Sequence, residues 1–386
     1  MNAVRARHLW TGDQWLQDAT VVLEDDRVVE VRPARPADGP ARSGMVIPGL
    51  INAHVHLELS HLVGRVPPSA RFGTWLADLV AHRTPIAPDQ LAAAAQAAVD
   101  LGTAAVVDIS NDGQTASAIV AAGLQGVVQH EVLGFHAPDL EERIAACSEP
   151  DRWVDGPAGG VWLRPGPHAP TSTPEALIAA AARPGNVPAS IHVAEDPAEL
   201  MLLADGSGPF ADLLDRLGRD WRWWTPPGCS PIAMLERLGV LGPSLLLVHA
   251  RHLGNGDSER IARSGAAVCL CPRSNMHIGQ AVPQVGALLE AGVDLLLGTD
   301  SLASCPDLDL FGEVDLLRSL RPDVPAATWL EAITGRAARR LDLAGLGRLS
   351  PGSRPGLLHV FAEPGGRWHG AERRWLARAR VEPLRE

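Results

Sequence analysis

The chain has 386 residues, of which 46% are hydrophobic and 20% are charged, a composition typical of a globular protein that can bury a large core. This length allows one large domain together with a smaller one, because single cores stop growing at about 250–300 residues. The net charge of −11 argues against a surface for nucleic acid or for an anionic membrane, so we expect a small molecule as the partner.

Three further features of the composition narrow the class of protein. The amino-terminal residues lack the apolar core of a signal peptide, and no run of about 18 apolar residues is present, which predicts a cytoplasmic protein. The five cysteines are scattered and odd in number, which favours reduced thiols over a disulfide framework. The chain contains no lysine, which excludes Schiff-base, pyridoxal-phosphate and P-loop chemistry. Composition does not determine the oligomeric state, and a homodimer is one of the open alternatives.

Both ends of the chain have the pattern of short, half-buried strands. Apolar and polar residues alternate between turn residues in four segments: 4–11, 18–33, 352–366 and 367–382. We therefore predict a small β-sandwich domain built from both chain termini, over residues 1–47 and 348–386. The segment 37–44 is expected to cross into the second domain.

The middle of the chain, residues 48–347, alternates apolar runs with Ala- and Leu-rich segments of helical spacing, as parallel βα units do. Eight apolar runs are expected to be strands: 46–58, 102–110, 123–134, 160–170, 188–195, 244–254, 265–275 and 292–301. Helices are expected between strands, among others over 89–101, 174–183, 230–239, 257–265 and 285–292. Eight such units predict an α/β fold of the (β/α)8 TIM barrel type.

An insertion rich in tryptophan separates the fifth and sixth expected strands. It contains Trp221, Trp223 and Trp224. Either it caps a substrate pocket or it packs onto the barrel, and large aromatic side chains suit both settings.

The carboxyl ends of the expected strands carry most of the candidate functional residues. In a (β/α)8 barrel this rim holds the active site, so polar side chains there are informative. Imidazole or carboxylate groups occur at the ends of five strands: His54 with His56, His168, His192 followed by Glu195, His249, and Asp300.

Four of these residues can form one metal site. Residues two apart in a strand face the same side, so His54 and His56 can both point inward. Neutral imidazole is a common ligand of zinc and iron, and a carboxylate completes such a set. Each histidine alone is more often structural, but the convergence of several strand ends favours a metal. We predict that His54, His56, His192 and Asp300 bind one divalent transition metal, Zn²⁺ or alternatively Fe²⁺.

Several motifs occur in an order that resembles the amidohydrolase superfamily, in particular its deaminase and chlorohydrolase branch. They are VIPGLINAHVHLELS, GPHAP, HVAE, LLLVHARHL, CPRSN and LGTDS, and they span nearly the whole chain. Within this branch, HLELS, the Arg273 of CPRSN and LGTDSLAS are similar to the aminodeoxyfutalosine deaminases of the futalosine route to menaquinone. One departure is that GPHAP continues into TST, where an aromatic residue is expected after the proline.

The resemblance implies a metal-dependent hydrolytic deaminase that uses the four metal ligands and three catalytic residues. Asp300 is expected to accept the proton of the attacking water, and His249 to orient that water and stabilise the tetrahedral centre. Glu195 is expected to protonate the ring nitrogen next to the attacked carbon and to help ammonia leave. Binuclear members bridge two metals with a carboxylated lysine, which this chain lacks, so one metal is expected.

The substrate implied by the resemblance is an aminopurine nucleoside that carries a benzoate. Arg273 is the candidate partner of the benzoate carboxylate, although it could instead pair with a neighbouring acidic residue. His168 and Ser301 are candidate substrate contacts, and Glu58 or Glu131 could accept the ribose hydroxyls. Each of these residues could also have only a structural role at the rim.

Two groups of alternative functions remain at this point. The first comprises other activities of the same branch, namely deamination of adenosine, methylthioadenosine, S-adenosylhomocysteine or guanine, and dechlorination of a triazine. The second is a catalytically silent interaction module, which the intact ligand set and Glu195 argue against.

Overall fold

The computed structural model describes the whole chain except residues 1, 70, 112, 136, 280–283 and 379–386. The end of the expected terminal domain, 379–386, therefore lies outside the described residues. Within the described part of the chain, no helix combines the length and the apolar character needed to cross a membrane.

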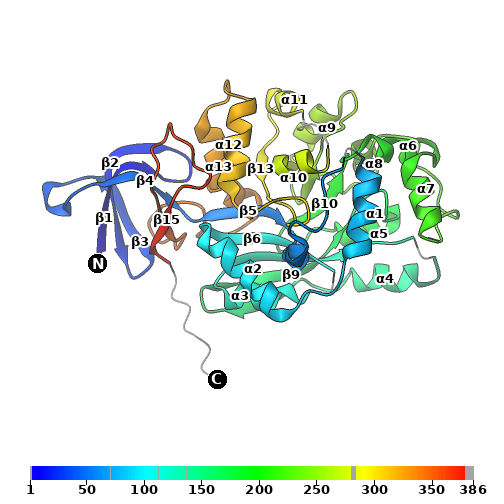
Figure 1. Cartoon of the computed structure of the whole chain (residues 1–386), viewed down its shortest axis with the longest axis horizontal. Coiled ribbons are helices and arrows are strands. Elements are labelled where there is room, and N and C mark those ends of the chain that lie inside the picture. The colour runs from blue at the N-terminus through cyan, green and yellow to red at the C-terminus, as the bar shows by residue number, and fades with distance from the viewer. Residues whose placement is uncertain (1, 70, 112, 136, 280–283, 379–386) are drawn as a thin grey trace.

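The two ends of the chain meet in one six-stranded sheet at one end of the molecule, where blue and red segments lie together in Figure 1. Its strands run in the order β15-β14-β4-β1-β2-β3. The expected β-rich unit from both termini is present, but a sandwich of two sheets is not confirmed. The strands are β1 (Asn2–Trp10), β2 (Trp15–Glu24), β3 (Arg27–Pro33), β4 (Arg42–Pro48), β14 (Leu357–Val360) and β15 (Arg373–Ala377).

The expected crossing segment differs from the observed structure. Part of it belongs to β4, which pairs parallel to β1 and antiparallel to β14. Met45 and Ile47 of β4 are fully buried, because the strand lies in the middle of the sheet. Only one residue, Gly49, then separates β4 from the first strand of the larger α/β part, so the two parts are closely joined.

The larger part is an α/β structure with two mainly parallel sheets. One has the order β5-β6-β7-β9-β8 and the other the order β10-β11-β12-β13. The eight parallel strands coincide with the eight segments expected from the sequence, with β9 beginning one residue early: β5 (Leu50–Val55), β6 (Thr103–Ser110), β7 (Gln125–Val132), β9 (Gly159–Pro167), β10 (Ala189–Val193), β11 (Leu245–His249), β12 (Ala267–Leu270) and β13 (Leu295–Leu297). The sequence did not predict β8 (Arg152–Gly156), which pairs antiparallel to β9.

Helices connect these strands and cover them (Figure 1). They are α1 (Phe72–His82), α2 (Pro88–Asp100), α3 (Thr115–Ala121), α4 (Leu140–Ala146), α5 (Glu175–Ala181), α6 (Pro197–Asp205), α7 (Pro209–Arg216), α8 (Pro231–Arg237), α9 (Asp257–Ser264), α10 (Pro272–His277), α11 (Val285–Glu290), α12 (Leu310–Leu320), α13 (Ala326–Ala332) and α14 (Gly335–Arg340). The local sequence explains where several of these helices begin. In α6, Asp196 caps the backbone N–H of Ala198 and Pro197 occupies the first turn.

Hydrogen bonds join the edges of the two parallel sheets. At one junction the backbone N–H of Asp300 donates to the carbonyl of His54 at 3.0 Å, and Val55 forms a parallel bridge with Asp300. At the other, the N–H of His192 donates to the carbonyl of His168 at 2.9 Å. Strand ends that are far apart in sequence therefore lie side by side.

The first junction predicts the effect of one substitution. A Cβ at Gly298 would lie 2.7 Å from the carbonyl oxygen of His54, so β13 can approach β5 only with glycine there. We expect Gly298→Ala to lower the free energy of unfolding by about 1–3 kcal/mol, measured by urea denaturation. Gly73→Ala in α1 is the control, because a Cβ there meets nothing within 4 Å. Equal stabilities of the two variants would contradict this account of the junction.

Candidate metal centre and catalytic site

Four side chains from three strand ends meet at the junction of β5, β10 and β13. The Nε2 atom of His54 lies 3.2 Å from the Nε2 atoms of both His56 and His192. The Oδ1 atom of Asp300 lies 3.7 Å from His54 Nε2 and 3.5 Å from His56 Nε2. Ligands about 2.0–2.1 Å from a zinc ion in a tetrahedral site would be about 3.3–3.4 Å apart, so this spacing fits one metal.

Hydrogen bonding also fits this donor set to a metal. His192 Nδ1 lies 2.9 Å from the carbonyl oxygen of His168, and only a protonated nitrogen can donate to a carbonyl. The proton of neutral His192 therefore sits on Nδ1, which turns the lone pair of Nε2 toward His54. Several lone pairs that meet at one buried point repel one another unless a cation lies between them. In addition, metal-binding histidines typically donate their other ring N–H to a carbonyl or carboxylate, as His192 does to the carbonyl of His168.

The site also favours the protonation states that metal binding requires. Burial, followed by the neighbouring His54, lowers the pKa of His192 to about 4, and the same two causes hold the pKa of His56 well below its usual value. Burial alone would raise the pKa of Asp300, but its hydrogen bond with His54 and the nearby His56 hold it well below the usual range. Neutral imidazoles and an ionised carboxylate are the forms that bind divalent metals.

Backbone strain is concentrated at these strand ends. Asp300 has φ 59°, His249 has φ 71° and Ala194 has φ 50°, although none of them is glycine. Left-handed conformations of such residues are costly and persist only where surrounding contacts impose them, often at functional sites. Here they turn the side chains of Asp300 and His249 toward the site.

Glu195 and His249 face each other beside the four ligands. The Oε1 atom of Glu195 lies 3.5 Å from Nε2 of His249. Burial, then the charge of Asp300, raises the pKa of Glu195 well above its usual value, which favours the protonated carboxyl that a proton donor needs. Two residues that were not among the candidates expected from the sequence fix the backbone of Glu195: Glu199 accepts a hydrogen bond from its N–H at 3.2 Å, and Arg251 donates to its carbonyl at 3.0 Å.

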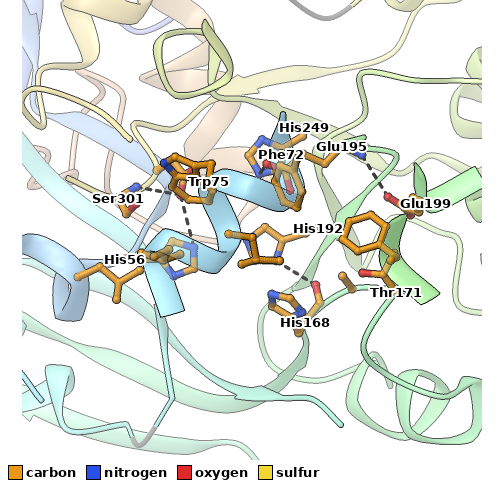
Figure 2. Close-up of a pocket in the computed structure, with 16 residues that line it drawn as sticks. His56, Phe72, Trp75, His168, Thr171, His192, Glu195, Glu199, His249 and Ser301 are labelled. Atoms are coloured by element: carbon orange, nitrogen blue, oxygen red, sulfur yellow. Dashed lines mark hydrogen bonds and ion pairs between the residues drawn. The ribbon is translucent and has the colours of Figure 1, made fainter. Parts of the chain in front are cut away.

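A cavity of about 110 Å³ opens onto this site, with a polar and an apolar side (Figure 2). The polar side is formed by His56, His168, Thr171, His192, Glu195, Glu199, His249, Asp300 and Ser301. The apolar side comes mainly from α1 and α7, with Leu59, Phe72, Trp75, Leu76, Leu79 and Phe210. The rings of Phe72 and Phe210 lie 5.7 Å apart, so the two helices together form an aromatic wall. The sequence analysis did not identify this wall.

The residues expected to contact substrate have different surroundings. His168 and Ser301 line the cavity. Glu131 is buried, with Oε1 3.8 Å from Nε2 of His168, and does not line the cavity. The carboxylate of Glu58 also lies outside it and accepts hydrogen bonds from Arg83, Ser110 and Asn111.

The structure corrects the expectation for Arg273. The residue lies in α10, because β12 ends at Leu270 and the strand does not continue through CPRSN as expected. The Arg273 guanidinium pairs with Glu313 at 2.6 Å and with Asp307 at 2.7 Å. It does not line the cavity, so the alternative of pairing with neighbouring carboxylates is the one observed.

Two other sequence features find an explanation. In the TST segment after GPHAP, the Ser172 hydroxyl lies 2.5 Å from Nδ1 of His168, so this departure supplies a partner for a cavity residue. In the tryptophan-rich insertion, Trp221 and Trp224 are buried, and the Trp224 indole donates to Glu175 at 2.6 Å. None of the three tryptophans is among the described residues that line the cavity, so the insertion packs onto the α/β part.

Comparison with known proteins decides the family. The model of the amidohydrolase family matches residues 45–366, which is most of the chain. The chain belongs to the amidohydrolase family.

Similar proteins in this family are deaminases. An aminodeoxyfutalosine deaminase of Deinococcus radiodurans is 33% identical over 76% of this chain and 72% of its own length. A 5-methylthioadenosine/S-adenosylhomocysteine deaminase of Syntrophobacter fumaroxidans is 31% identical over 83% of this chain and 73% of its own. The crystal structure of an adenosine deaminase from Xanthomonas campestris with bound zinc has a TM-score of 0.72 and 25% identity, covering 93% of this chain and 84% of that one. This chain is thus a metal-dependent amidohydrolase that hydrolyses a C–N bond, with deaminases among its relatives.

The ligand geometry predicts the effect of removing one imidazole. We expect His192→Ala to lose both bound metal and activity, measured by elemental analysis and by ammonia release, whereas the unaltered protein binds one transition metal per chain. His359→Ala is a matched control, because His359 is a buried histidine that bonds the Ser43 carbonyl in the small sheet. Two catalytic metals per chain, or full activity of metal-free protein, would contradict the prediction.

A different outcome is expected for Glu195, because it lies beside His249 and is expected to be a proton donor and not a metal ligand. We expect Glu195→Gln to keep its metal but to lower kcat by about 10²–10⁴, the usual contribution of a positioned acid or base. Metal content and kcat measured on the same preparation provide the test. If the variant lost its metal, Glu195 would be a ligand and not a proton donor.

Proposed function

We propose that this protein deaminates a 6-aminopurine nucleoside with one bound Zn²⁺, and that its main substrate is aminodeoxyfutalosine, converted to futalosine and ammonia. The observation that carries this proposal is the Glu195 carboxyl beside His249, facing the same cavity as His56, His192 and Asp300. A site that only bound a metal would have no need of a buried proton donor. The bridge between Val55 and Asp300 supports closure of the two parallel sheets into a (β/α)8 barrel around this site.

Each catalytic residue has one task in this reaction. His54, His56, His192 and Asp300 would hold a divalent cation, which would lower the pKa of water from 15.7 to about 7 and so make it a nucleophile at neutral pH. Asp300 takes the proton of that water, and His249 holds its oxygen toward the amino-bearing carbon. Glu195 gives its proton to the adjacent ring nitrogen. The proton taken by Asp300 then reaches the amine, which leaves as ammonia, and the hydroxyl of the tetrahedral centre returns a proton to Glu195 as the carbonyl forms. One metal suffices because the chain has no lysine to carboxylate as a bridge.

The apolar wall supports a nucleoside with an apolar or aromatic group. Phe72, Trp75 and Phe210 face the metal ligands across the cavity, where an aromatic ring of the substrate can stack. Aminodeoxyfutalosine carries such a ring in its benzoate, and the Deinococcus relative is named for this substrate. No lysine or arginine is among the described residues that line the cavity, which favours methylthioadenosine as the second candidate.

Arg83 is our candidate partner for the benzoate carboxylate. It follows α1, its side chain is 41% exposed, and its guanidinium donates to Oε1 of Glu58 at 2.8 Å. Burial and then the charge of Arg83 lower the pKa of His168 to about 4, which indicates that this cation lies close to the cavity. An exposed guanidinium can turn from Glu58 toward a bound carboxylate, whereas the buried Arg273 is fully engaged.

Ammonia release across three substrates tests this proposal. We expect the highest kcat/KM on aminodeoxyfutalosine, with methylthioadenosine and adenosine lower. Arg83→Met should lower kcat/KM on aminodeoxyfutalosine roughly 10- to 150-fold, the effect of losing a charge-assisted hydrogen bond of about 1.5–3 kcal/mol, and should change adenosine little. Higher kcat/KM on methylthioadenosine would favour the second candidate. An equal loss on all substrates would mean that Arg83 acts only through Glu58.

A further inference from the structure

Arg273 belongs to a dense buried network behind the metal site. Its Nε donates to Glu313 Oε1 at 2.6 Å, and its backbone N–H donates to Glu313 Oε2 at 2.9 Å. Its Nη2 donates to Asp307 Oδ1 at 2.7 Å. Only 12% of the Arg273 side chain is exposed, and none of the Glu313 side chain. A single carboxylate thus holds both the main chain and the side chain of Arg273.

The helix that supplies Glu313 approaches Arg273 very closely. A Cβ at Gly312 would lie 2.3 Å from Nη1 of Arg273, so only glycine leaves room for the guanidinium against α12. Contacts between α10 and α12 follow from this approach. The pair of Arg273 and Glu313 therefore sets the position of the first turn of α10.

The next residue of α10 holds a metal ligand. The hydroxyl of Ser274 donates to Oδ2 of Asp300 at 2.6 Å and lies 2.7 Å from the hydroxyl of Ser304. The other oxygen, Oδ1, accepts the N–H of Ser301 at 2.8 Å and faces the imidazoles of His54 and His56. Ser274 thus engages one oxygen of Asp300 and leaves the other directed toward the metal site.

The residue after that holds the catalytic histidine. The side-chain amide of Asn275 lies 3.3 Å from Nδ1 of His249, on the side of the ring opposite to Glu195. This contact fixes the ring plane of His249, whose Nε2 faces the carboxyl of Glu195. Three consecutive residues of α10 therefore connect Glu313 to Asp300 and to His249.

We propose that Arg273 and Glu313 are positioning residues for the reaction, which fix α10 so that Ser274 and Asn275 hold Asp300 and His249 in their working orientations. The main-chain bond from Arg273 to Glu313 is the decisive contact, because it lies one residue before Ser274. The proposal rests on metal-dependent deamination and not on which nucleoside is the substrate. In this proposal the ion pair affects the metal affinity and kcat through α10, whereas a purely structural ion pair would affect only stability.

The test compares Arg273→Met with Arg32→Met. Arg32 is a matched control, because its side chain is also 12% exposed and pairs with the buried Asp38, but it lies in the small sheet. We expect Arg273→Met to weaken Zn²⁺ binding, measured by competition with a chelating dye, and to lower kcat, each by about 10- to 100-fold. KM should change little, and the loss in kcat should be similar on aminodeoxyfutalosine and adenosine. Arg32→Met should leave Zn²⁺ affinity and kcat unchanged.

Three results would overturn the proposal. A loss confined to aminodeoxyfutalosine would make Arg273 a substrate contact. A fall in melting temperature with normal Zn²⁺ affinity and normal kcat would make the pair purely structural. If Arg273→Met does not fold, Ser274→Ala replaces it, because this change removes only the hydroxyl bonded to Asp300. Normal Zn²⁺ affinity and kcat in Ser274→Ala would then refute the positioning role. Failure of the proposed substrate would leave the Zn²⁺ measurements unaffected.

Discussion

The structure depends on one electrostatic constraint, the meeting of several lone pairs at a buried point. The Nε2 atoms of His54, His56 and His192 and the Oδ1 atom of Asp300 lie within 3.2–3.7 Å of a neighbour in the group. Without a cation this arrangement is repulsive, so folding alone does not explain it. The left-handed backbone at Asp300 is energetically unfavourable, and the close approach at Gly298 tolerates only glycine. The surrounding contacts of the fold keep both features in place at this site.

Around this point the chemistry is divided among different sheet edges. The four expected metal ligands come from β5, β10 and the end of β13, whereas the proposed proton donor, Glu195, follows β10 and its neighbour His249 ends β11. The aromatic wall comes from helices that lie outside the strands, α1 and α7. Because the wall and the hydrolytic centre lie on different elements, the wall can differ between relatives without altering the centre.

Two arginines illustrate how burial decides the role of a residue type. Arg273 is enclosed by Glu313 and Asp307, so its charge is used within the protein. Arg83 has one carboxylate partner in Glu58 and remains 41% exposed, so its guanidinium is open to solvent. The same guanidinium group is therefore committed to an internal network in one place and left accessible in the other, which is why the two arginines are proposed to have different roles.

The sequence by itself determined the eight parallel strands and the residues at their ends. Strand alternation and glycine or proline boundaries are local signals, and His54, His192 and Asp300 follow directly from them. Only the tertiary structure decided the role of Arg273, because its partner Glu313 is 40 residues away and α10 replaces the expected end of a strand. The aromatic wall of the cavity could also be identified only from the tertiary structure. Phe72 and Phe210 carry no local signal of their meeting, since long-range packing alone brings α1 and α7 together.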